Sequence, residues 1–176
     1  MKVEVGTKFG MRGDLMVVRR SARTGDIESV WEKKNTITFA GPEAVIALLA
    51  PNIALGASVQ EQSQIKSMRF GTSNLAPEVS QTALASEASV AGTPVRVELV
   101  DANRLIGSGT VEFIATLNSG TGNGVTYREA GLFTRGTADD PVVTTGAAMF
   151  ARQVFPEQPK TSAVELEFRW RITITV

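Results

Sequence analysis

The side chains that most often carry out catalysis or bind metals are missing from this sequence. Its 176 residues include no histidine and no cysteine. The first absence removes the usual general base and the commonest metal ligand, and the second removes thiolate nucleophiles, disulfides and zinc sites built on sulfur. Any catalysis would have to use carboxylates, lysine, tyrosine or a serine–lysine pair. We therefore expect a protein that is not an enzyme and that holds no cofactor and no metal.

The carboxylates that could form a catalytic pair or a calcium site do not have the spacing that either site needs. Asp139 and Asp140 are adjacent in a loop that ends at Pro141, and Glu129 and Asp101 are near them in chain order only. The spacing of a calcium-binding loop of the EF-hand type is not present. We interpret the pair as a solvated loop. A lyase or glycosidase that uses two carboxylates is the enzymatic alternative.

Three short motifs match known sites by their letters alone. Residues 12–14 spell the RGD tripeptide that integrins recognise, but a glycine and an aspartate before a strand also suit a turn. The glycine-rich segment 118–124 lacks the spacing of a phosphate-binding loop, and we expect it to be a hairpin tip. Ser63 and Lys66 have the spacing of a penicillin-binding serine–lysine pair without its companion motifs. We interpret all three as structural.

The most regular spacing of charged side chains lies near the end of the sequence. From Val164 to Val176 every second residue is apolar, and charged residues or threonines stand between them. This alternation predicts one long strand with a buried face and a charged face. A solvated face with cross-strand ion pairs is the simpler interpretation, and a charged interface that fixes the register between subunits is the alternative. The candidate interface residues are Arg12, Asp14, Glu165, Glu167, Arg169 and Arg171.

The elements that would position these residues are mostly short strands. Besides 164–176, strands are expected at 15–20, 27–33, 36–39, 65–70, 95–100, 110–117, 125–134 and 147–155. Gly25 and Asp26 predict a hairpin turn, and the prolines at 156 and 159 predict a loop that joins the last two strands as an antiparallel hairpin. Pro42, Glu43 and Pro51 delimit one short helix. The pattern predicts a mainly β fold, an antiparallel β-sandwich or jelly-roll-like domain with one short α-helix.

Length and charge set the domain organisation and exclude some partners. We expect an N-terminal arm at 1–14 and a single β-sandwich domain at 15–176, with an extended loop or arm at about 72–92. Low hydrophobicity in 1–14 and 72–92 makes both segments candidates for reaching onto neighbours and ordering on assembly. Eighteen basic residues balance eighteen acidic ones, which argues against nucleic acid as a partner. No apolar run approaches the roughly 20 residues that span a membrane, so we expect no membrane partner.

Four ordered segments share their patterns with one group of known proteins. They are KNTIT at 34–38 leading into 41–42 and 47–49, MRFGT at 68–72, YREAGLF at 127–133, and MFAR at 149–152 followed by 155–156, Lys160 and FRWRI at 168–172. Together they cover roughly residues 30 to 176 and resemble small structural proteins encoded in the morphogenesis modules of tailed bacteriophages. Within the third segment, a strand bulge or a close backbone approach is expected at Gly131. Glu129 is expected to pair with Arg128 or Arg152.

The resemblance implies a non-enzymatic virion protein that is made in the cytoplasm of the bacterial host and assembles through protein–protein contacts. Its implied partners are copies of itself, as a homo-oligomer, and other virion proteins of the tail, the portal region or the major capsid shell. We expect a place in the tail, collar or baseplate. A capsid decoration protein that bridges capsomers is one alternative, and a receptor- or carbohydrate-binding module is another.

Overall fold

A computed structural model describes residues 10–49, 63–100, 104–107, 109–135 and 147–175. In this part of the chain one helix, α1 (Ala40–Leu49), accompanies the strands. The strands are β1 (Gly10–Ser21), β2 (Ile27–Lys34), β3 (Thr36–Ile37), β4 (Ile65–Gly71), β5 (Ser89–Val90), β6 (Thr93–Pro94), β7 (Arg96–Glu98), β8 (Arg104–Gly107), β9 (Thr110–Leu117), β10 (Thr126–Thr134), β11 (Met149–Pro159) and β12 (Val164–Thr175).

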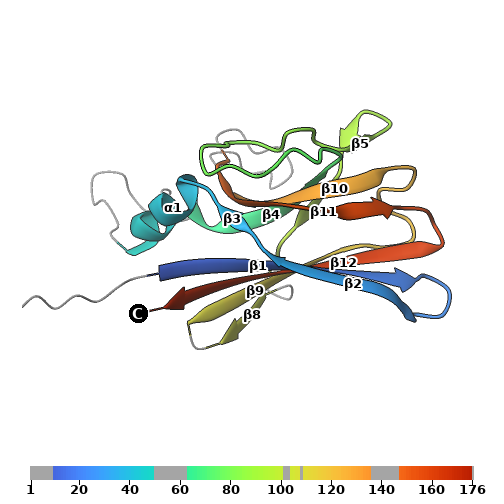
Figure 1. Cartoon of the computed structure of the whole chain (residues 1–176), viewed down its shortest axis with the longest axis horizontal. Helices are drawn as coiled ribbons and strands as arrows, with labels where there is room; N and C mark the ends of the chain where they lie inside the picture. The colour runs from blue at the N-terminus through green and yellow to red at the C-terminus, as the bar shows by residue number, and fades with distance from the viewer. Residues whose placement is uncertain (1–9, 50–62, 101–103, 108, 136–146, 176) are drawn as a thin grey trace, which may run out of the picture.

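The strands form two antiparallel sheets that pack against each other (Figure 1). Sheet A has five strands in the order β2-β1-β12-β9-β8, and sheet B has five in the order β3-β11-β10-β4-β7. β5 and β6 form a separate two-stranded hairpin. The predicted mainly β fold, an antiparallel β-sandwich with one short helix, is confirmed.

The long C-terminal strand is the centre of sheet A. β12 pairs with β1 along one edge and with β9 along the other. Its apolar residues Val164, Leu166, Phe168, Trp170 and Ile172 are each at most 4% exposed, as the alternation predicts. The ring of Phe168 lies 4.6 Å, centroid to centroid, from that of Phe70 in sheet B. Full burial of each large apolar side chain contributes about 1.5–3 kcal/mol, so this strand anchors the core.

The predicted hairpin between the last two strands is wrong. β11 pairs with β10 and β3 in sheet B, whereas β12 belongs to sheet A, so residues 160–163 cross between the sheets. β11 also continues past Pro156 to Pro159, beyond the predicted loop boundary. β3 pairs with β11 only at Ala151 and Arg152. Pro156 therefore needs no ladder hydrogen bond to β3, and a proline is tolerated there.

The start of the chain corrects one predicted boundary. β1 begins at Gly10, so residues 10–14 belong to sheet A and not to an arm, and Asp14 lies opposite Arg171. Residues 1–9 of the predicted arm lie outside the described residues. The predicted β1–β2 hairpin with its turn at Gly25 and Asp26 is confirmed. After Lys34 the chain leaves sheet A and crosses to sheet B as β3 (Figure 1).

Candidate functional site

The six candidate interface residues lie on one face of sheet A. Side chains directly opposite each other in an antiparallel pair share a face. Asp14 lies opposite Arg171 and Arg20 lies opposite Glu165, so these positions of β1 and β12 face the same way. This shared face points outward, because the residues of β12 between the charged ones, such as Leu166, Phe168 and Trp170, point into the core. The charged face that the alternation predicts is therefore present as the outer face of sheet A.

Charged side chains on this face form a continuous ladder across β1, β12 and β9. Glu167 Oε1 is 3.8 Å from Arg20 Nη2 and 2.7 Å from Arg169 Nε. Arg169 Nη1 lies 3.6 Å from Glu112 Oε1, and Arg171 Nη2 lies 2.9 Å from Glu112 Oε2. The hydrogen bond with Glu167 raises the pKa of the Arg169 guanidinium. We call these five residues the outer-face ladder.

Arg12 and Asp14 form a separate pair beside the ladder. Arg12 Nε lies 2.9 Å from Asp14 Oδ2, and the hydrogen bond with Asp14 raises the pKa of the Arg12 guanidinium. Both residues stand within extended β1, where Asp14 is buried and bonded, and not in the turn that we predicted before the strand. This setting differs from an exposed loop tip that could present an RGD tripeptide to a receptor.

The energy of these pairs favours a role in specificity. An exposed ion pair contributes about 0.2–1 kcal/mol, because solvent screens it and two long side chains lose freedom. The arginine ends of the outer-face ladder are screened in this way, since Arg20, Arg169 and Arg171 keep 30%, 38% and 47% of their side chains exposed, whereas Glu112 and Glu167 are only 10% and 19% exposed and depend on these arginines as partners. Charged groups of both signs on a sheet face do select partners and fix their register.

A second charged cluster lies buried on the outer face of sheet B. Arg152 Nε donates to Glu129 Oε2 at 2.7 Å, Arg152 Nη2 lies 2.7 Å from the same oxygen, and both side chains are 0% exposed. Arg152 Nη1 also donates to Gln81 Oε1 at 2.9 Å. Of the two partners that the sequence left open for Glu129, the structure shows Arg152, whereas Arg128 pairs with Glu157.

This buried pair holds residues 72–92, which we call the strap, against sheet B. Glu129 accepts hydrogen bonds from the backbone N–H groups of Ser86 at 2.8 Å and Ala85 at 3.2 Å. A Cβ built on Gly131 would lie 3.1 Å from the Leu84 side chain of the strap, so the glycine makes room for this side chain; the register irregularities of β10 lie on either side of Gly131 and not at it. In the segment predicted as an extended loop or arm, at about 72–92, no strand precedes β5 at Ser89–Val90. The strap folds back onto its own sheet and does not project as an arm.

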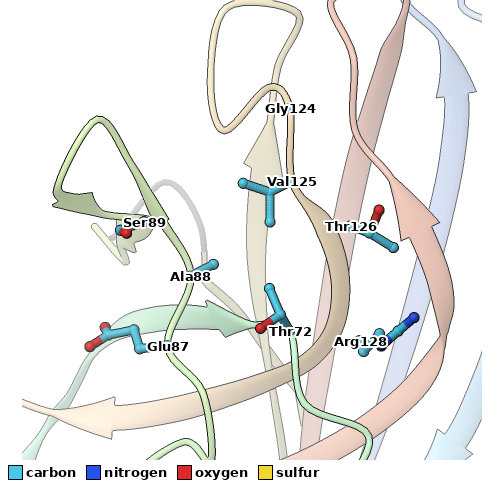
Figure 2. Close-up of a pocket in the computed structure, with 8 residues that line it drawn as sticks. All are labelled: Thr72, Glu87, Ala88, Ser89, Gly124, Val125, Thr126 and Arg128. Carbon is cyan, nitrogen blue, oxygen red and sulfur yellow. The ribbon is translucent and has the colours of Figure 1, made fainter.

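A hollow of about 470 Å³ lies between the strap and the start of β10 (Figure 2). Figure 2 shows Glu87 and Arg128 on opposite sides of it. Glu87 is bonded to Arg96 Nε at 2.7 Å, and Arg128 is paired with Glu157. Among the described residues that line this hollow, none is aromatic. They are Thr72, Glu87, Ala88, Ser89, Gly124, Val125, Thr126 and Arg128.

The glycine-rich segment 118–124 is a turn between the sheets and not the predicted hairpin tip, because β9 lies in sheet A and β10 in sheet B. Lys160 is 1% exposed and donates from Nζ to Asn123 Oδ1 at 2.7 Å. Desolvation lowers the pKa of the Lys160 amine. The Tyr127 hydroxyl donates to Gly122 O at 2.8 Å, and burial raises its pKa to about 12. The two side chains fix the shape of this turn.

The remaining candidates for chemistry do not come together. Asp101, Asp139 and Asp140 lie outside the described residues. Lys66 is on β4, and Ser63 precedes that strand. The described ranges contain no group of three acidic residues that could hold a metal ion. Within the same ranges, no helix is long and apolar enough to cross a membrane.

Sequence reasoning did not identify two members of the outer-face ladder, Arg20 and Glu112. The sequence did contain a signal for Glu112, because it is a charged residue in a strand that was predicted with its correct bounds. What was missing was the register between β9 and β12, which sequence spacing does not give.

Comparison of the chain with family models, with curated proteins and with solved structures gave no match.

Proposed function

We propose that this chain is a non-enzymatic structural protein of a tailed-bacteriophage virion, placed in the tail, collar or baseplate. It assembles through protein–protein contacts with copies of itself and with neighbouring virion proteins. The observation that carries the proposal is the outer face of sheet A. There the outer-face ladder and the Arg12–Asp14 pair put charges of both signs on one sheet face.

A charged sheet face of this kind suits a contact that must be specific. Arg171, Arg169 and Arg12 keep 47%, 38% and 59% of their side-chain surface exposed, so each can bond a neighbour while holding its present partner. Arginine presents five N–H donors in a rigid fork, which allows this sharing. The four segments that resemble phage structural proteins supply the virion part of the proposal.

The location is tested by electron microscopy of purified particles that carry a gold-labelled copy of the chain. The proposal expects label at the tail, collar or baseplate. Label scattered over the head would favour the capsid decoration alternative. Absence of the chain from purified particles would reject the virion proposal as a whole.

A further inference from the structure

β2 is an edge strand of sheet A that is paired on one side only. It pairs with β1 from Ile27 to Lys34 and stands first in the strand order of the sheet (Figure 1). In the ranges that the structure describes, no strand lies along its other side. Seven of its eight residues are exposed. β2 therefore offers a complete strand edge to a partner.

The backbone groups on the open side of β2 belong to Val30, Glu32 and Lys34. The N–H of Asn35 donates to the Gly13 carbonyl of β1 at 2.9 Å, so the backbone groups of Asn35 point toward β1. In an antiparallel ladder this direction alternates from one residue to the next. The N–H and C=O groups of every second residue from Lys34 back to Val30 therefore point away from β1 and can pair with an added strand.

The open edge also carries apolar side chains that water reaches. Val30 is 55% exposed and Ile27 is 56% exposed. Trp31 is partly buried, and its ring lies 6.0 Å, centroid to centroid, from that of Phe155 in β11. Edge strands that stay unpaired usually avoid exposed apolar side chains, because these favour pairing with another strand. The composition of the edge therefore favours an interface.

The charges along this edge have an order that a second copy of the chain complements. Asp26 and Glu28 stand at its start, and Lys33 and Lys34 stand at its end. The Glu28 side chain stays 41% exposed, although its Oε2 lies 2.8 Å from Arg19 Nε. Two copies of β2 in antiparallel orientation place the acidic start of each strand beside the basic end of the other. Opposite charges across an interface favour association, so this order identifies a second copy as the occupant.

Charge also selects the register of the two strands. A two-fold axis through Trp31 sets Val30 opposite Glu32 of the second copy and Lys34 beside its Glu28. An axis through Val30 would set Glu28 opposite Glu32, and an axis through Glu32 would set that carboxylate opposite itself. Like charges directly opposite each other destabilise a strand pair. Of these three registers, only the one centred on Trp31 avoids the repulsion.

We propose that two copies of the chain pair through β2 in antiparallel orientation, around a two-fold axis through Trp31. The two copies of sheet A then form one continuous sheet, and the interface is the same surface on both copies. This pairing rests on the proposed function only for the assembly of copies with each other, and it uses the edge of sheet A and not its charged outer face. One strand edge is smaller than the interface of a stable dimer, so the isolated dimer should be weak.

The test compares two variants of Val30, which shares the outer face of sheet A with Glu32 and lies past the register shift of β2. In the dimer, Val30→Lys would pair with Glu32 of the second copy twice, and Val30→Glu would oppose the same carboxylate twice. Both variants lose the same valine, so the ratio of their dissociation constants isolates the charge. Sedimentation equilibrium of the purified full chain should give a dissociation constant about tenfold lower for Val30→Lys than for Val30→Glu. The matched control is Leu75→Lys and Leu75→Glu, at an exposed apolar position of the strap, and these two variants should dimerise alike.

Isotope-filtered NMR of a mixture of labelled and unlabelled full chain locates the contact. In this register Ser29 lies opposite Lys33 of the second copy as a pair without backbone hydrogen bonds, whose Cα atoms approach to about 4.5 Å. We therefore expect an NOE between the Hα atoms of these two residues in different copies. Arg169→Glu/Arg171→Glu, which changes the outer-face ladder, should keep this NOE. Failure of the edge pairing is therefore distinguishable from failure of the proposed function.

Three results would overturn the proposal. The first is a chain that stays monomeric at millimolar concentration, which would leave the edge to another occupant. The second is a dimer without the Ser29–Lys33 NOE between copies, which would place the contact on another surface. The third is a dissociation constant that is equal for the two Val30 variants, as an axis through Val30 would give, or lower for Val30→Glu.

Discussion

The substitution Glu129→Gln removes one charge from the buried Glu129–Arg152 pair and keeps the size of the side chain. Arg152, at 0% exposure, is left as an uncompensated buried cation. The new amide also places an NH₂ donor where a carboxylate oxygen now accepts backbone N–H groups of the strap. Breaking a buried pair from one side costs about 3–5 kcal/mol. For a chain of this size that loss lowers Tm by about 10 °C.

The assay is urea unfolding followed by tryptophan fluorescence, with hydrogen exchange of the Ala85 and Ser86 amides as a local readout. Both amides should exchange faster in the variant because they lose their acceptor. Adding Arg152→Met should restore part of the lost stability, because the buried cation is then gone.

The matched control is Glu157→Gln, which breaks the Arg128–Glu157 pair near the same strands. The Glu157 side chain is 62% exposed, so this change should cost less than about 1 kcal/mol. A Glu129→Gln variant within 1 kcal/mol of the wild type, or no less stable than the control, would refute the argument that the buried pair fixes the strap.

Three further predictions concern the turn at 118–124 and the strap. Tyr127 is the only tyrosine, and because burial raises its pKa to about 12, its contribution to stability is present below pH 10.0 and lost as the pH rises toward 12. Phenolate absorbance of the native chain should titrate about two pH units above that of the unfolded chain, and a native midpoint near the ordinary value would contradict this. Desolvation holds the pKa of Lys160 below 10.5, so the folded chain should gain stability relative to Lys160→Met as the pH rises toward 10.5. If the difference in unfolding free energy between the wild type and Lys160→Met stayed constant or fell as the pH rises, the lowered pKa of Lys160 would be excluded. Gly71→Ala should cost about 1–3 kcal/mol, because its Cβ would lie 2.4 Å from both Glu129 Oε1 and Ser86 O. The control for Gly71→Ala in the same unfolding assay is Gly120→Ala, whose Cβ would meet nothing nearer than 3.5 Å. Equal losses of stability in the two variants would contradict a steric cost at Gly71.

Alternation in the sequence was enough to predict which faces of the strands are buried. β12 is the clearest case, because thirteen residues of strict alternation leave no helical alternative and its inward side chains from Val164 to Ile172 are buried in the core, although Ile174 is 38% exposed. The bounds predicted for β9 agree with those observed. The Glu129–Arg152 pair was one of two options, and the sheet register selected Arg152.

What alternation did not give is the identity of neighbouring strands. β11 and β12 follow each other closely in the chain, yet they lie in different sheets. A period of two fixes the face of a residue and says nothing about its partner across the ladder. For the same reason Glu112 and Arg20 were not recognised as members of the outer-face ladder. Lys160 follows two prolines and reads as a loop residue, and only the fold shows that its amine is buried.

We propose that the outer face of sheet A is a contact surface in a virion. It is tested most directly by competitive incorporation of the wild type and Arg169→Glu/Arg171→Glu into particles, with the ratio measured by mass spectrometry. The control is the double variant Arg23→Glu/Lys33→Glu, which reverses two charges outside the outer-face ladder. Both double variants must first unfold within a few degrees of the wild-type Tm. We expect the ladder variant to be strongly under-represented in particles and the control to be incorporated as well as the wild type. Equal incorporation of the ladder variant, the control and the wild type would contradict it.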